Sequence, residues 1–297
     1  MDKYFLLLLS AFLFSCEFIF LKLFEDKNGS SYTSALCFSL GSSVIGLPIL
    51  FICNGFSLGF SWFSLSMAAL LALVCVGANI LGVKAVSFGS VAVYTLFLML
   101  GGMMIPFLVG GIFLNEQVKI WYIVATVLLT GALVLPIFDK SEQTEKKGKF
   151  MAFIALCVVL FFLNGINSTI GKLHQIGGEI GGEIVGTVDF LIWKYIFKIL
   201  ICGILFLFHK EKSKTTLLIS KSSLWTNSGF AVVHIAATLL QLYCAISVNA
   251  SMMYPLVTGG TLVFTPILSK ILFKEKISVW TFTGIVVSVV ATVLFVF

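Results

Sequence analysis

The sequence contains little charge. Only 11% of its 297 residues are charged and 59% are hydrophobic, whereas soluble globular domains carry about 25% charged residues. Arginine is absent, so all 19 basic residues are lysines, and no extended basic region is present to grip a nucleic acid backbone. The mean hydropathy is +1.10. These values exclude a water-soluble domain and indicate an integral membrane protein with no nucleic-acid partner.

The sequence also lacks the motifs of common catalytic and metal sites. Its three histidines are scattered at 174, 209 and 234, and no H-E-x-x-H or G-x-S-x-G arrangement occurs. The seven cysteines have no spacing suited to zinc or redox chemistry. No G-x-x-x-x-G-K-[ST] loop is present to bind ATP. We therefore expect neither an enzyme nor a metal or other cofactor.

Ten apolar runs are long enough to cross a bilayer as helices, which needs about 20 residues each. The runs lie at 4–24, 32–53, 63–84, 90–113, 119–138, 150–171, 187–208, 227–248, 251–273 and 278–296. The charged stretch DKSEQTEKKGK at 139–149 separates five runs from five. We predict an all-α integral membrane fold of ten transmembrane helices, in two five-helix units at 4–138 and 150–297.

The two units resemble each other in sequence, most clearly in their last two spans. At a displacement of 160 residues, identical residues coincide at Ser87 and Ser247, Tyr94 and Tyr254, Leu96 and Leu256, Pro106 and Pro266, and, after one gap, Glu116 and Glu275. The first spans match at a displacement of 150, where Lys22 meets Lys172. Because each unit has an odd number of spans, the second enters the membrane in the opposite direction. The pattern predicts an inverted repeat.

In each unit, small polar residues precede a proline-containing helix, and an acidic residue opens the next span. The first copy reads KAVSFGS at 84–90, then Pro106 and NEQ at 115–117. The second reads CAISVNAS at 244–251, then Pro266 and KEK at 274–276. With these ordered copies, the chain resembles the drug/metabolite transporter superfamily, and within it the ten-span EamA-like proteins. The resemblance implies a secondary transporter whose substrate cavity lies between the two units.

Lysines are distributed unevenly between the two predicted sides of the membrane. Fourteen lie on the side of the linkers that follow spans 1, 3, 5, 7 and 9, and three lie on the side of both termini. Because loop lysines stay cytoplasmic, this bias predicts that both termini face outward from the plasma membrane. The family resemblance implies cytoplasmic termini instead.

Two lysines fall inside a predicted span. Lys194 and Lys198, in FLIWKYIFKILICGILFLF at 190–208, are four residues apart and so share one helical face. Charged groups inside a span usually face the protein interior or a water-filled cavity. This pair predicts a cationic site for a substrate carboxylate or phosphate. The alternative is that both side chains snorkel to the nearby interface.

Glu17 is the one acidic residue well inside a predicted span. As the natural counter-ion of Lys198 it predicts a buried ion pair. A carboxyl group in low dielectric can also load and release a proton, so proton or other ion coupling is a second interpretation. Cation recognition and a purely structural ion pair are the remaining alternatives.

Other polar residues inside the spans are candidates to bind substrate, or else join helices by hydrogen bonds. They are Asn79, Asn164, Asn167, His234, Gln241, Tyr94 and Tyr254. Asn164 and Asn167 share one helical face, and Asn167 occupies the repeat position of Glu17. Tyr94 and Tyr254 are related by the repeat and offer both a ring and a hydroxyl.

Two repeat-related prolines, Pro106 and Pro266, are expected to kink their helices because proline removes an amide donor and clashes with the preceding turn. Glycines at 101, 102, 110, 111, 259 and 260 flank them. The arrangement predicts that spans 4 and 9 act as opposing gates. Static packing kinks are the alternative.

Together these features predict a secondary transporter that moves small polar organic metabolites by alternating access. Lys194 and Lys198 favour anionic or zwitterionic substrates such as amino acids or organic acids. An exporter of hydrophobic or cationic compounds, using Glu17 and the 30 phenylalanines, is the alternative. A non-transporting scaffold or receptor is another. The expected partners are a small-molecule substrate, the lipid bilayer and a coupling ion.

Overall fold

The computed structural model describes residues 2–29, 31–86, 88, 91–135, 150–209, 214–274 and 279–295. All regular structure in these residues is helical, and no strand occurs among them. The long helices are α1 (Asp2–Asn28), α2 (Tyr32–Cys53), α3 (Trp62–Val86), α4 (Val91–Phe113), α5 (Ile120–Val134), α6 (Phe150–Gln175), α7 (Thr187–Phe208), α9 (Lys221–Ala245), α10 (Ala250–Phe273) and α11 (Val279–Leu294). Two short helices, η3 (Gly177–Ile180) and α8 (Lys214–Ile219), lie in connections. The predicted linker at 139–149 lies outside the described residues.

Seven helical stretches in the described residues are long and apolar enough to cross a membrane. They are Lys3–Asn28, Tyr32–Cys53, Trp62–Gly82, Met151–Gln175, Thr187–Phe208, Lys221–Ala245 and Ala250–Phe273. Shorter apolar stretches, Phe97–Phe113, Ile120–Val134 and Phe282–Leu294, lie in α4, α5 and α11. The chain is therefore a helical multi-pass membrane protein, as its composition predicts.

Each predicted span overlaps one long helix, although some ends differ. α9 begins at Lys221 rather than 227, because the Ser220 hydroxyl accepts a hydrogen bond from the Ser223 amide at 3.1 Å and caps the helix. α6 continues to Gln175 rather than ending at 171. Lys172, placed outside the spans by the sequence, therefore lies in the last turn of α6 and is 5% exposed. The sequence does not predict the short helix α8.

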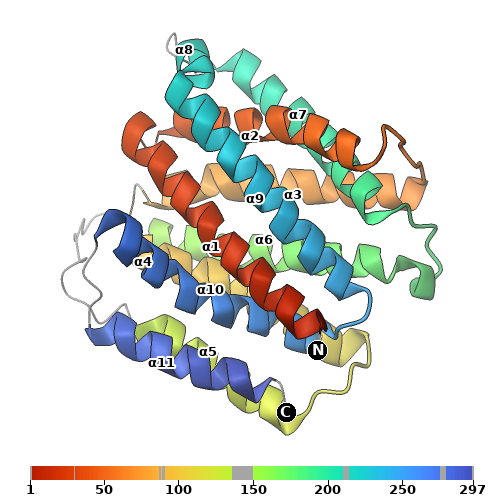
Figure 1. Ribbon diagram of the computed structural model, residues 1–297, viewed down its shortest axis with the longest axis vertical. Coiled ribbons are helices and arrows are strands. Elements are labelled where there is room, and N and C mark those ends of the chain that lie inside the picture. Colours follow the sequence, from red (N-terminus) through yellow and green to blue (C-terminus); the bar gives the residue numbers. More distant parts are fainter. Residues whose placement is uncertain are drawn as a thin grey trace.

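The helices of the two sequence units are interleaved (Figure 1). α1 packs on α9 and α10, whereas α6 packs on α3 and α4. α2 packs on α7 and α9, and α3 packs on α7. Two further pairs are α4 with α10 and α5 with α11. Like the pair of α2 with α7, they join helices of the same rank in each unit. Exchanging the two units, helix for helix, leaves this set of neighbours unchanged.

Small residues bring helices together at equivalent places in the two units. A Cβ atom on Gly101 of α4 would collide with the backbone of Phe161 in α6. On the other side, the Thr261 hydroxyl of α10 contacts the Ala11 carbonyl of α1 at 3.5 Å. Thr261 lies 160 residues after Gly101, and Phe161 lies 150 residues after Ala11. The contact thus follows the two displacements of the sequence repeat.

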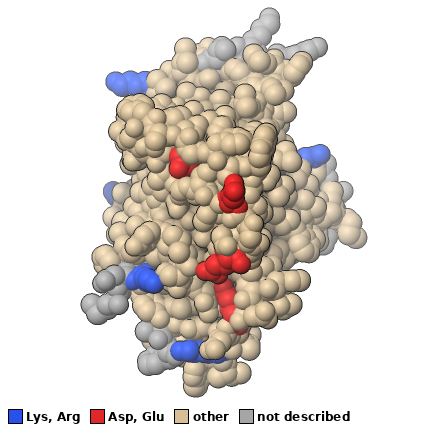
Figure 2. Space-filling model, turned by 90° about the vertical axis from the view of Figure 1, so that its right-hand side faces the viewer, with Lys and Arg blue, Asp and Glu red and all other residues tan. Residues whose placement is uncertain are grey.

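The two ends of the bundle differ in charge. Both chain ends lie at one end, which we call the terminal end (Figure 1). Figure 2 shows carboxylates along this end, and its connections and their flanking turns contain Glu116, Glu179, Glu183 and Asp189. At the opposite, lysine-rich end, Glu25 and Asp26 are accompanied by exposed lysines at positions 27, 84, 221, 270 and 274. The described residues therefore retain the lysine asymmetry seen in the sequence.

Candidate functional site

An acid and an imidazole meet near the middle of the bundle. Glu17 on α1 and His234 on α9 are joined by a 2.8 Å contact between Oε2 and Nδ1. Their side chains are 19% and 21% exposed. The His234 ring also stacks on Phe230, with centroids 5.3 Å apart and planes 10° apart. Both residues lie near the midpoints of their helices, so the pair forms a half-buried polar group at mid-depth.

This pairing differs from the ion pair that the sequence predicts. Glu17 and Lys198 are both described, and no hydrogen bond or ion pair joins them. The physical reason is the packing of α1, which lies against α9 and α10 and so directs Glu17 towards His234 instead of α7. The prediction of a direct Glu17–Lys198 pair is therefore wrong.

A second polar pair lies at the equivalent place in the other half of the fold. The Cys75 thiol on α3 donates a hydrogen bond to Asn167 Oδ1 on α6 at 2.9 Å. Asn167 is the repeat counterpart of Glu17, and Cys75 lies one residue from the counterpart of His234. Two polar pairs, one acidic and one neutral, thus connect α1 with α9 and α6 with α3.

The two lysines of α7 are enclosed without a bonded protein partner. Lys194 is 6% exposed, and Lys198, one turn further along the helix, is partly buried. Among the described residues, neither ammonium group makes a hydrogen bond or an ion pair. A buried charge without a partner is costly. Binding of a ligand carboxylate or phosphate by these two lysines stays a prediction.

The side chain of Lys194 lies nearer the terminal end than that of Lys198. The neighbouring Trp193 donates a hydrogen bond from Nε1 to the Gly59 carbonyl in the α2–α3 connection at 2.9 Å. This contact anchors the first half of α7 to the connection. Because Lys194 lies close to the terminal end, snorkelling is the alternative interpretation for its side chain. Lys198 lies one turn further from that end.

Several other candidates join helices. Asn79 donates to the Ser39 hydroxyl at 3.1 Å, and Asn164 donates to the Leu98 carbonyl at 2.7 Å. Gln241 is partly buried and has no hydrogen bond among the described residues. Tyr94 lies in α4, but its side chain is outside the described part of the chain. These contacts leave the substrate-binding roles of the residues as predictions.

The predicted gating prolines lie inside helices that touch each other. Pro106 is in α4 and Pro266 is in α10, and these two helices pack together. α10 contains a further proline, Pro255. The structure places both prolines inside long helices that pack together, while the kinks and the gating role stay predictions.

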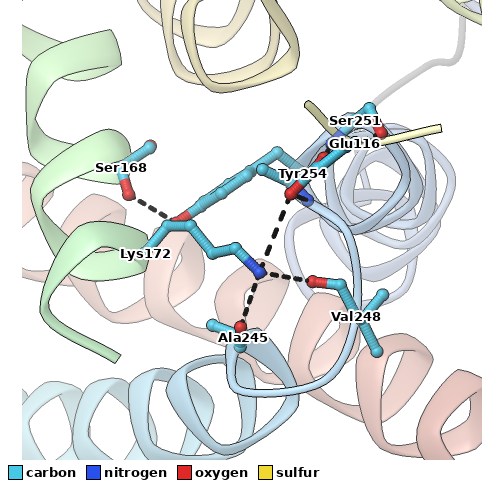
Figure 3. Close-up of polar contacts among 8 residues, drawn as sticks. Glu116, Ser168, Lys172, Ala245, Val248, Ser251 and Tyr254 are labelled. Atoms are coloured by element: carbon cyan, nitrogen blue, oxygen red, sulfur yellow. Dashed lines mark hydrogen bonds and ion pairs between the residues drawn. The ribbon is translucent and has the colours of Figure 1, made fainter. Parts of the chain in front are cut away.

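A polar cluster at the terminal end was missed by sequence reasoning. It contains Glu116, Lys172 and Tyr254, which come from the α4–α5 connection, α6 and α10 (Figure 3). Only Tyr254 was a candidate. The available signals were the repeat pairs Lys22 with Lys172 and Glu116 with Glu275. These pairs do not show that Glu116 and Lys172 lie close together, because that depends on the packing of helices from different units.

Two cavities of about 220 Å³ lie at opposite ends of the bundle. The one at the lysine-rich end is lined by Phe18, Ile19, Lys22, Met99, Thr265 and Ser269. The one at the terminal end is lined by Lys3, Tyr4, Leu7, Tyr122, Ser247, Val248, Asn249 and Met252. The described residues contain no group of three or more His, Cys, Asp or Glu side chains arranged to hold a metal ion.

Comparison with known proteins identifies the fold without naming a function. No family model matches the chain, and no curated protein sequence matches it. A solved structure titled "Crystal structure of protein" superimposes with a TM-score of 0.72, covering 99% of this chain and 96% of that chain. The two sequences are 11% identical. The chain therefore shares its whole fold with a known structure.

Proposed function

We propose that the protein is a secondary transporter built from two inverted five-helix repeats, with ten membrane spans and an EamA-like organisation. The packing supports this proposal, because the neighbours of each helix are preserved when the two units are exchanged. The contacts of Gly101 with Phe161 and of Thr261 with Ala11 support it independently, since they follow the sequence displacements. Such repeats place substrate sites at the interface between the units.

The proposed substrates are small anionic or zwitterionic metabolites, such as amino acids or organic acids. The observation that carries this choice is the Lys198 ammonium, which is partly buried in the bundle and has no bonded partner among the described residues. Lys194 adds a second cation one turn away. Export of cationic compounds would use the Glu17 carboxylate, which here already contacts His234.

The Glu17–His234 pair is the proposed ion-coupling group. Both partners can change protonation, and their side chains are about one fifth exposed. A carboxylate and an imidazole in contact at mid-depth can hold or release a proton as the site changes its access to water. The proton gradient would then drive transport without ATP.

The proposed orientation places the lysine-rich end in the cytoplasm and the terminal end outside the plasma membrane. It follows from the rule that lysines near span ends stay cytoplasmic. The exposed lysines at positions 27, 84, 221, 270 and 274 support it.

Uptake into proteoliposomes tests the proposed function. Purified protein would be reconstituted and assayed with radiolabelled amino acids, organic acids, phosphorylated sugars and organic cations. We expect one anionic or zwitterionic class to be transported, and Lys198→Met to reduce its uptake at least about tenfold, because losing one charge-assisted contact weakens binding by about 1.5–3 kcal/mol. Lys221→Met, at an exposed lysine of α9, is the matched control and should transport normally.

Two outcomes would contradict the proposal. Folded wild-type protein that transports none of these classes would argue against a transporter. Full activity of Lys198→Met would remove Lys198 from the substrate site. The thermal stability of each variant, measured with and without the substrate, separates lost binding from lost folding.

A further inference from the structure

We propose that the cavity at the terminal end binds a phosphate group, carried by an anionic phospholipid headgroup or by a small soluble phosphate compound. We call this space, which Lys3, Tyr122, Ser247 and Asn249 line together with apolar residues, the terminal cavity. Its volume is about 220 Å³, whereas pockets for drug-sized ligands occupy about 300–1,000 Å³. The terminal cavity therefore suits a compact group. The inference goes beyond the proposed transport function, because it depends on the lining residues alone.

The terminal cavity lies at the ends of membrane spans. Its lining comes from the first turns of α1, α5 and α10 and from the α9–α10 turn. Span ends lie at the depth of the lipid headgroups, where tyrosine is common, and Tyr4 and Tyr122 both belong to the lining. On the same two helices, Phe5 and Ile120 are 66% and 65% exposed, as expected of side chains that face lipid. Phospholipid phosphates therefore lie at the same depth as the cavity.

The described lining contains a cation and no carboxylate. Lys3 is exposed, and among the described residues its ammonium group makes no hydrogen bond or ion pair. An ammonium group donates hydrogen bonds and accepts none. No Asp or Glu is among the described residues that line the cavity. The terminal cavity is therefore suited to an anion.

Lysine is scarce on this side of the membrane, and it gathers at the terminal cavity. The sequence places three lysines on the side of both termini. Lys3 lines the cavity, and the Lys119 ammonium lies 5.8 Å from the ring centroid of Tyr122, within the range of a cation–π contact. The third, Lys172, lies 3.8 Å from the Glu116 carboxylate. Two of the three positive charges thus lie at or beside this one cavity.

Tyr122 provides a buried hydroxyl that has a weak partner. The residue is 7% exposed, and its hydroxyl donates to Met252 Sδ at 3.7 Å. A thioether sulfur is a weak acceptor, and a buried donor without a strong acceptor costs free energy. An oxygen atom of a bound ligand would give this hydroxyl a strong acceptor. Tyr122 therefore favours an oxygen-rich anion.

Asn249 contributes a side chain that has no capping role. It precedes α10, a position where an asparagine side chain ordinarily accepts a hydrogen bond from a first-turn amide. Asn249 makes no such bond. The Glu116 carboxylate instead accepts from the amides of Ala250 at 2.8 Å and Ser251 at 3.0 Å. The Asn249 side chain is therefore available to donate to a ligand in the cavity.

A phosphate group fits these donors better than a carboxylate. The donors come from three places in the fold: Lys3 on α1, Tyr122 on α5 and Asn249 before α10. A phosphate group offers more acceptor oxygens than the two of a carboxylate, and lysine binds phosphates as a point charge. The apolar lining residues Leu7 and Met252 would contact the carbon atoms attached to the phosphate.

Native mass spectrometry of the purified full-length chain tests the proposal. The protein would be equilibrated in detergent with dioleoylphosphatidylglycerol, dioleoylphosphatidylcholine or glycerol 3-phosphate, and the bound molecules would be counted from the mass of the complex over a titration. The two lipids share acyl chains and differ in net charge, and glycerol 3-phosphate has no acyl chain. The three probes therefore separate a lipid source of the phosphate from a soluble one.

We expect phosphatidylglycerol or glycerol 3-phosphate to bind more tightly than phosphatidylcholine. Lys3→Gln should weaken this binding about tenfold, because it removes a hydrogen bond between charged groups, and Tyr122→Phe should weaken it about threefold. Lys27→Gln, at an exposed lysine at the other end of α1, is the matched control and should bind like the wild type. Higher ionic strength should weaken binding more in the wild type than in Lys3→Gln, because salt screens exposed charges.

Selective binding of phosphatidylglycerol that is lost in Lys3→Gln would support the proposal with a lipid as the source. The same loss for glycerol 3-phosphate would support it with a soluble source. Equal binding of the two lipids without glycerol 3-phosphate, equal affinities of Lys3→Gln and Lys27→Gln, or no binding of any probe would overturn it. Melting temperatures confirm that each variant is folded. Since none of these measurements involves uptake, failure of the proposed transport function would leave this test unaffected.

Discussion

The Glu17 carboxylate contacts the His234 imidazole at 2.8 Å and links the middle of α1 to the middle of α9. The equivalent link between α6 and α3 is the neutral bond from the Cys75 thiol to Asn167. The two contacts join corresponding pairs of helices, and only the one on α1 and α9 pairs a carboxylate with an imidazole. This difference places the candidate coupling group asymmetrically in a fold whose helix packing is symmetric.

A double-mutant cycle on Glu17→Gln and His234→Gln should show strong non-additivity. Because the two side chains contact each other directly, we expect a coupling energy of about 1–3 kcal/mol in the free energy of unfolding. Thermal or denaturant unfolding in detergent measures it. The cycle of Glu17→Gln with Lys198→Met serves as the control, and its coupling should be smaller because no bond joins that pair. Equal coupling in both cycles would contradict the assignment of His234 as the partner.

Gly101→Ala should destabilise the protein by about 1–3 kcal/mol, the usual cost of forcing extra volume into a packed interior. The added methyl group would meet the Phe161 backbone, which has no side-chain rotamer by which to move aside. Gly131→Ala in α5 is the matched control, because a Cβ atom there meets nothing within 4 Å. It should be neutral or stabilise by about 0.5–1 kcal/mol through helix propensity. Similar melting temperatures for the two variants would argue against the close α4–α6 contact.

Pro106→Ala and Pro266→Ala should slow transport while leaving substrate binding unchanged. Each substitution restores an amide donor inside its helix and stiffens the bend that a gate would use. Initial uptake rates measure transport, and the thermal shift produced by the substrate measures binding. Pro48→Ala, inside α2, is the control and should transport normally. Unchanged rates in both α4 and α10 variants would favour static kinks.

Reporter fusions test the proposed orientation. A phosphatase fused after the last residue should be active, and a fluorescent protein fused at the same place should be dark, because both termini are expected outside. Insertion of each reporter within 139–149 should give the opposite results. A fluorescent C-terminal fusion with an inactive phosphatase fusion would reverse the orientation and agree with the family resemblance.

The sequence predicts the helices well because spanning length and apolar composition are local properties. It predicts their ends less well. α6 extends past 171 to Gln175. Within this extension the Lys172 ammonium donates to the carbonyls of Ala245, at the end of α9, and Val248, in the α9–α10 turn, both more than 70 residues away in the chain. From the sequence alone, a lysine next to an apolar run is assigned to a loop, because its distant hydrogen-bond partners are not known.

The candidate site could be predicted only in part for the same reason. Glu17 and Lys198 stand out because ionisable groups are rare inside spans, but the choice between Lys198 and His234 as partner of Glu17 depends on which helices touch. Asn164 was grouped with Asn167 by spacing, yet it bonds the Leu98 carbonyl of α4 while Asn167 faces α3. Shared helical faces are visible in a sequence, whereas the helix that each face meets is not.

The interleaved packing has a consequence for how the molecule assembles. α1 lies against α9 and α10, and α6 lies against α3 and α4. The main partners of each unit's first helix therefore belong to the other unit. Neither unit alone would bury those helix faces, so α1 must wait in the bilayer until α9 and α10 are made. The chain should therefore acquire its final structure late and all at once, and separately expressed units should be recovered folded only as a pair.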